Sequence, residues 1–87
     1  MKASHASVER LVKTARGQLD GVIKMIEEDR YCIDISNQLL AAEAILRKAN
    51  QKIIAAHLKS CVVNATPGEE LDEKLKEITD VMERMGK

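Results

Sequence analysis

The feature that most constrains this 87-residue chain is a long stretch without any helix-breaking residue. Between Asp34 and Asn64 there is no glycine and no proline. Apolar residues recur there at alternating steps of four and three, the spacing of a heptad seam. The members of this seam are Ile35, Leu39, Ala42, Leu46, Ala49, Ile53 and Ala56. One unbroken helix of about 30 residues is about 45 Å long, which is too long to be enclosed in one small globule.

A shorter helix is predicted before this segment, from about Val8 to Glu28. Its apolar residues follow the three-four spacing of a single helical face, and Ser7 is the predicted N-cap. Gly17 and Gly21 lie inside the helix, where each costs about 0.5–1 kcal/mol relative to alanine. We therefore expect close packing against another backbone at these two positions. The break before the long helix falls at residues 28–31.

The long helix is expected to end in Asn64-Ala65-Thr66-Pro67-Gly68, and a third, shorter helix follows, marked by apolar residues from Leu71 to Met82. Tyr31 is the only aromatic residue, so the core must be aliphatic, which favours helices over a β-sandwich. The sequence predicts a single all-α domain over residues 1–87, a three-helix protomer with a long central helix and a flexible N-terminal arm at residues 1–6. Because the third helix is too short to cover the central one, we expect an antiparallel dimer at minimum.

Composition narrows the setting in which the protein works. No run of about 18 apolar residues and no apolar leader occur, so we expect a soluble cytoplasmic protein without a membrane partner. In the cytoplasm its two cysteines would stay reduced. Residues 1–60 hold ten Lys/Arg against seven Asp/Glu, and residues 61–87 hold four against seven. The positive first part is compatible with a nucleic-acid face, although solvated helix surfaces give similar numbers.

Three residues form the candidate metal site. His57 and Cys61 are four residues apart, so they share one face of the long helix. An isolated pair of this kind is more often a surface histidine and a packed cysteine. Cys32, however, lies 25 residues before His57, about 37 Å along a continuous helix. An antiparallel partner would bring the three together in two identical sites, with the twofold axis near Ile45 and Leu46.

Two thiolates and one imidazole form a soft, three-ligand set that suits copper(I). Structural zinc normally takes a fourth ligand, and His5 could supply one, which keeps zinc and nickel open; otherwise His5 is a solvated arm residue. Paired thiols also leave open a redox sensor of persulfides or electrophiles. An enzyme is not expected, because a small helical chain offers no evident pocket for a small-molecule substrate and no oxyanion site.

At these positions the chain resembles the copper-sensitive operon repressor (CsoR) family of bacterial regulators, over nearly its whole length. The stretches that carry the resemblance are R-G-Q-L-D-G at 16–21, E-E-D-R-Y-C at 27–32, R-K-A-N at 47–50 and A-H-L-K-S-C at 56–61.

The resemblance implies copper ligation by Cys32, His57 and Cys61 in a dimer of dimers without a helix-turn-helix. It implies a repressor that leaves its operator, and so releases a copper-efflux operon, when copper(I) binds. It further implies that Tyr31 and Glu77 meet the ring nitrogen of His57 that does not bind copper, which would fix the imidazole. The alternatives are a packing role for Tyr31 and an exposed charge at Glu77. Persulfide sensors of this family replace the histidine, so His57 argues against that class.

The candidate DNA face is basic and has no interleaved aromatic residues, so phosphate contacts and shape readout would dominate. Its members are Arg10, Lys13 and Arg16 of the first helix and Arg47, Lys48 and Lys52 of the long helix. Each of them could equally be a solvated helix charge. One departure from the family affects this set: the arginine usually found six residues before Gly17 is Leu11 here, with Arg10 one place earlier.

Overall fold

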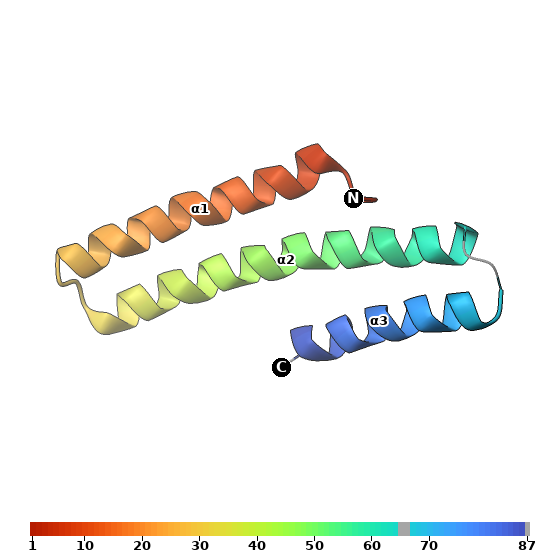
Figure 1. Cartoon of the computed structure of the whole chain (residues 1–87). Coiled ribbons are helices and arrows are strands. Elements are labelled where there is room, and N and C mark those ends of the chain that lie inside the picture. The colour runs from red at the N-terminus through yellow and green to blue at the C-terminus, as the bar shows by residue number, and fades with distance from the viewer. Residues whose placement is uncertain (65–66, 87) are drawn as a thin grey trace.

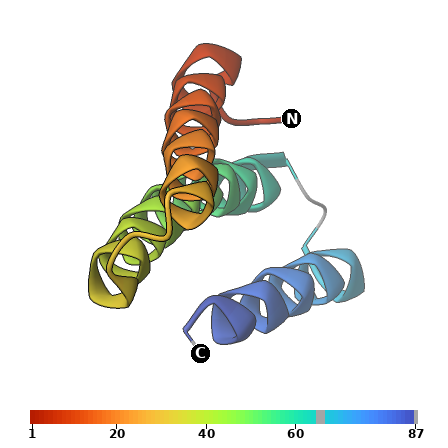
Figure 2. The same ribbon diagram turned by 90° about the vertical axis from the view of Figure 1, so that its left-hand side faces the viewer.

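The computed structural model describes residues 1–64 and 67–86. Within them the chain forms three helices and no strand: α1 (His5–Glu27), α2 (Cys32–Asn64) and α3 (Glu69–Met85). In Figure 1, α1 runs antiparallel to α2, and α3 runs antiparallel along the C-terminal half of α2. The end view in Figure 2 places α1 and α3 on different sides of α2. The described chain measures 56 × 27 × 13 Å, and the predicted three-helix protomer with a long central helix is confirmed.

The first helix begins earlier than the sequence predicted. Ser4 is its N-cap, because the Ser4 Oγ accepts the amide N–H of Ser7 at 3.3 Å and the Ser4 carbonyl accepts that of Val8 at 3.1 Å. The prediction of Ser7 as the cap is therefore wrong. His5 and Ala6, which were expected in the arm of residues 1–6, belong to the first turn of α1. Both serines can cap a helix, and the apolar pattern that begins at Val8 does not reveal a polar first turn.

The turn between α1 and α2 satisfies the last carbonyls of α1. Asp29 donates its amide N–H to Ile26 O at 3.0 Å, and Arg30 donates to Met25 O at 3.0 Å, the pair of bonds of a Schellman motif. Asp29 has a φ of 52°, a left-handed conformation that aspartate tolerates better than most residues. The chain thus reverses within four residues and places Cys32 in the first turn of α2.

The second reversal begins where α2 ends, at Asn64, as the sequence predicted. Of the expected breaking segment, residues 65–66 lie outside the described part of the chain. Gly68 then has a φ of 108°, which a residue with a Cβ rarely adopts, and its carbonyl accepts the amide N–H of Asp72 at 3.0 Å. Three acidic residues in the first turn of α3 stabilise the helix, because their negative charges lie near the positive N-terminal end of its dipole. The long helix α2 has 33 residues, which corresponds to about 50 Å.

The core is small, and a seven-residue spacing relates its three members on α1 and two of its three members on α2. The buried side chains are Val8, Ala15 and Val22 of α1, Ala42, Ala49 and Cys61 of α2, and Ile78 of α3. The rows of α1 and α2 pack against each other along the antiparallel pair. Within the predicted heptad seam, only Ala42 and Ala49 are buried. Leu39 and Leu46 keep 45% and 44% of their surface exposed. The seam therefore retains uncovered leucines in one chain, which is compatible with the predicted dimer.

The expected close approach at Gly17 and Gly21 does not occur within the chain. A Cβ at either glycine would meet no atom within 4 Å, so both positions face open space in the described structure. Among the described helices, none combines the length and the apolar character that crossing a membrane requires.

Candidate metal and nucleic-acid sites

His57 and Cys61 lie together in a hollow between α2 and α3. The hollow has a volume of about 310 Å³, and Glu70 and Lys74 of α3 line it along with Lys2 of the N-terminal segment. Cys61 is buried, with 7% of its surface exposed, and His57 is partly buried. The shared face that the sequence predicted for this pair is therefore present and is walled by another helix.

Glu70, Lys74 and Lys2 were not identified from the sequence. The two α3 residues are four apart and therefore share a helical face. They come next to Cys61 because α3, which begins at Glu69, runs antiparallel along the C-terminal half of α2. An antiparallel helix pair with a short connection could have indicated them. No pattern in the sequence indicates Lys2, whose position depends on how the segment before α1 lies on α2.

Cys32 lies at the opposite end of α2 from this hollow. It is exposed, it forms no disulfide, and Tyr31 beside it has 66% of its surface exposed. The 25 residues between Cys32 and His57 are all helical, which separates the two by about 37 Å. Across residues 1–64 and 67–86 no three His, Cys, Asp or Glu side chains come close enough to hold a metal ion. Within one chain, Cys32 therefore lies far from His57 and Cys61, and the three predicted ligands do not meet.

The donor chemistry of these parts fits a soft metal ion. Cys61 supplies a thiol in a shielded position, His57 supplies an imidazole one helical turn away, and Cys32 supplies a free thiol at an open surface. Thiolate and imidazole ligands suit copper(I) and zinc, whereas they do not suit magnesium or calcium.

The residues predicted to surround the site are not assembled in one chain. Glu77 is exposed on α3 and does not line the hollow, although Glu70 and Lys74 of the same helix do. Tyr31 is at the far end of α2. Their contacts with His57 therefore stay predictions. His5 is exposed in the first turn of α1 and also does not line the hollow.

The six cations of the predicted DNA face lie in different surroundings. On α1, Lys13 pairs with Glu9 (Nζ to Oε1, 2.8 Å), and both side chains are well exposed, so this pair contributes little to stability. Arg10 borders the same shallow hollow as Lys13. Arg16 and Lys48 are exposed, and neither has an ion-pair partner among the described residues.

Arg47 faces α3. Its Nη1 donates to the carbonyl of Met85 at 3.0 Å, and its Nη2 lies 3.8 Å from Glu43 Oε1. Carbonyls in the last turn of a helix lack intrahelical partners, so this guanidinium satisfies one of them at the C-terminal end of α3. Lys52 instead lines a groove between α2 and the start of α1. The structure thus brings Lys52 and Arg47 to different sides of α2.

Comparison with known proteins gives consistent matches. The model of the metal-sensitive transcriptional repressor family matches residues 4–84. The copper-sensing transcriptional repressor CsoR of Mycobacterium tuberculosis (strain H37Rv) is 35% identical over 77 residues, which are 88% of this chain and 64% of that protein. CsoR of Mycobacterium ulcerans is 48% identical over 56 residues, 64% of this chain and 47% of that protein. The chain therefore spans about half to just under two thirds of the length of these relatives.

Two further similarities extend the comparison. The copper-sensing repressor RicR of Mycobacterium tuberculosis is 36% identical over 76 residues, 85% of this chain and 79% of that protein. The solved structure of the nickel-responsive transcriptional regulator InrS superposes with a TM-score of 0.78 over 98% of this chain and 96% of that one, at 21% identity. At this identity the structural likeness establishes the fold alone.

Proposed function

Because the chain belongs to the metal-sensitive transcriptional repressor family, we propose that it is a copper(I)-responsive repressor that works in the cytoplasm. It binds operator DNA without metal and releases it when copper(I) binds, so that copper-efflux genes are expressed. The observation that carries this proposal is the placement of the two sulfur donors and the imidazole. Cys61 and His57 share one hollow, and Cys32 is free at the other end of α2. Relatives named copper-sensing repressors support the choice of metal.

The proposed site forms between two chains. An antiparallel partner places its Cys32 beside His57 and Cys61 of the first chain, and the symmetry of the pair produces a second, identical site. The incompletely covered leucines of the seam, Leu39 and Leu46, favour such a pair, because burying them would remove apolar surface from water. Two dimers would then form the tetramer that the family resemblance implies.

The proposed DNA contacts are basic and are directed at phosphates. Arg10, Arg16, Lys48 and Lys52 are the strongest members of the predicted set, because none of them has an ion-pair partner among the described residues. The other two members, Lys13 and Arg47, would first have to leave Glu9 and the Met85 carbonyl. Binding of this kind depends strongly on salt, since each phosphate contact releases counterions.

Copper(I) would act on the tetramer through the imidazole. When it ties Cys32 of one chain to His57 and Cys61 of another, His57 would draw Tyr31 and Glu77 into a new arrangement, in which the basic faces no longer fit DNA. Coupling between two ligands is reciprocal, so operator DNA must weaken copper binding by the same factor.

Because the imidazole is proposed to carry the change, a His57→Ala variant should bind copper through its cysteines and remain on DNA. Normal release from DNA by this variant would contradict the coupling.

The decisive experiment is an anaerobic operator-binding assay with four competing inducers: copper(I), zinc(II), nickel(II) and a persulfide donor. We expect copper(I) alone to release the DNA, with one equivalent bound per chain and thiolate charge-transfer absorption. Release by the persulfide donor but not by copper(I) would replace the proposal with a thiol redox sensor. Release by nickel or zinc alone would move the assignment to those metals. Absence of salt-sensitive binding to any promoter fragment would leave a metal-binding protein that is not a repressor.

A further inference from the structure

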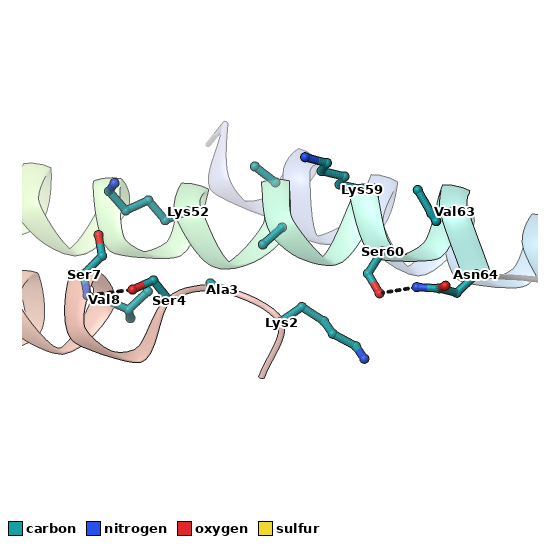
Figure 3. Close-up of a pocket in the computed structure, with 12 residues that line it drawn as sticks. Lys2, Ala3, Ser4, Ser7, Val8, Lys52, Lys59, Ser60, Val63 and Asn64 are labelled. Atoms are coloured by element: carbon teal, nitrogen blue, oxygen red, sulfur yellow. Dashed lines mark hydrogen bonds between the residues drawn. The ribbon is translucent and has the colours of Figure 1, made fainter.

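A second feature of the surface is a groove between the start of α1 and the C-terminal half of α2. It has a volume of about 620 Å³, and Lys2, Lys52 and Lys59 stand at its border together with the hydroxyl groups of Ser4, Ser7 and Ser60. Figure 3 shows Lys52 and Lys59 on the α2 side of the groove and Lys2 on the opposite side. The groove thus presents cations from two segments that are far apart in the sequence.

The electrostatics of this groove are one-sided. No carboxylate is among its lining residues, and none of its three lysines has an ion-pair partner within the described chain. The first turn of α1 adjoins it and contains no acidic residue, in contrast to the first turn of α3, which contains three. In a protein of net charge zero, such a concentration of positive charge favours an anionic partner.

We propose that this groove binds the sugar-phosphate backbone of duplex DNA and that Lys59 and Lys2 extend the DNA interface beyond the predicted basic residues. This rests on the proposed repressor function, because Lys52 belongs to both surfaces. Lys52 and Lys59 are seven residues apart on α2, about 10 Å along its axis, whereas phosphates of one strand advance about 3.4 Å per step. The two amines therefore reach separate phosphates. Serine hydroxyls are common donors to phosphate oxygens, and they are present beside the lysines.

The test measures the salt dependence of DNA binding by the full-length, metal-free protein, using fluorescence anisotropy of a labelled promoter duplex. The variants are Lys59→Gln, Lys2→Gln and the double substitution. Lys76→Gln on α3 is the matched control, because it removes the same charge from an exposed position outside the groove. The slope of log K against log salt is negative, and we expect its magnitude to fall by about 0.9 for each lost phosphate contact in the two single variants. The control should keep the wild-type slope.

The outcomes separate this inference from the function on which it rests. Wild-type protein that binds no duplex would contradict the repressor function itself. Wild-type binding with unchanged slopes for the Lys59 and Lys2 variants would overturn the groove as a DNA site and leave the repressor function intact. An equal fall in slope for Lys76→Gln would also overturn it, because the effect would then reflect net charge. Unfolding curves for every variant check that exposed lysine-to-glutamine changes leave the fold intact.

Discussion

The two ends of α2 each provide a cysteine, and the surroundings of the two cysteines differ. Cys61 is buried, and it shares a hollow with His57 that α3 closes on one side. Cys32 is exposed in the first turn of α2, after a tight turn, and its neighbour Tyr31 is exposed as well. The C-terminal end thus places a buried thiol and a partly buried imidazole around one hollow, whereas the N-terminal end presents a single exposed thiol. In the proposed metal site, the exposed Cys32 of one chain would therefore join His57 and Cys61, which already line one hollow in the other chain.

The largest expected effect comes from removing either thiol. We predict that Cys32→Ser and Cys61→Ser each lower copper(I) affinity at least about 100-fold, more than changes around the ligands usually cost. Neither variant should leave DNA in response to copper. Competition with a copper(I) chelator under anaerobic conditions measures the affinity.

A mixing experiment tests whether the ligands of one site come from two chains, with Cys32 from one chain and His57 and Cys61 from the other. Dimers that combine a Cys32→Ser chain with a His57→Ala/Cys61→Ser chain should regain one copper site, because one complete set of ligands remains between them. The expected stoichiometry is one copper(I) per mixed dimer. If mixing restored no binding, the three residues could not form a site shared between chains.

The next effect concerns α3, which packs beside the C-terminal end of α2 and not beside its N-terminal end. Ile78 anchors α3 on α2 with 3% of its surface exposed, so Ile78→Ala should lower the free energy of unfolding by about 2–5 kcal/mol. Glu83→Ala is the control on the same helix, because Glu83 is exposed and surface changes usually stay within about 0.5 kcal/mol. Denaturant unfolding measures both. Hydrogen exchange should accelerate around Cys61 and stay unchanged around Cys32. Equal acceleration at both ends would show that α3 does not support one end selectively.

The smallest effect compares the two cysteines as packing residues. Cys61→Ser places a hydroxyl in a buried position and should destabilise the metal-free protein by about 1–3 kcal/mol. Cys32→Ser changes an exposed side chain and should stay within about 0.5 kcal/mol. Thermal unfolding without metal gives both values. Equal losses would mean that the two surroundings do not differ in solution as they do in the structure.

The sequence predicted the helices well because their signals are local. An unbroken heptad pattern defined α2, and turn residues marked both of its ends. The start of α1 was displaced because two serines compete for the cap and the apolar pattern cannot distinguish them. The close packing expected at Gly17 and Gly21 is absent from the described structure. Such packing depends on which neighbouring element faces the helix, and the sequence of the helix alone does not determine that.

The candidate site was predictable only in part for the same reason. The shared face of His57 and Cys61 follows from their spacing, and it is present. The α3 wall of Glu70 and Lys74 depends on how two helices lie against each other. Arg47 was grouped with the other cations by charge, but its position toward α3 gives it a carbonyl partner. Contacts between elements decide these roles, whereas the sequence pattern reports single elements.

The distance between Cys32 and His57 has a consequence for dosage. If a complete detector requires two chains, then copper binding and chain association are linked, and each strengthens the other by mass action. The copper concentration that gives a half-maximal response should then fall as the protein becomes more abundant, until every chain is paired. A cell with few copies of this protein would have fewer detectors, and each remaining chain would also respond less readily to copper.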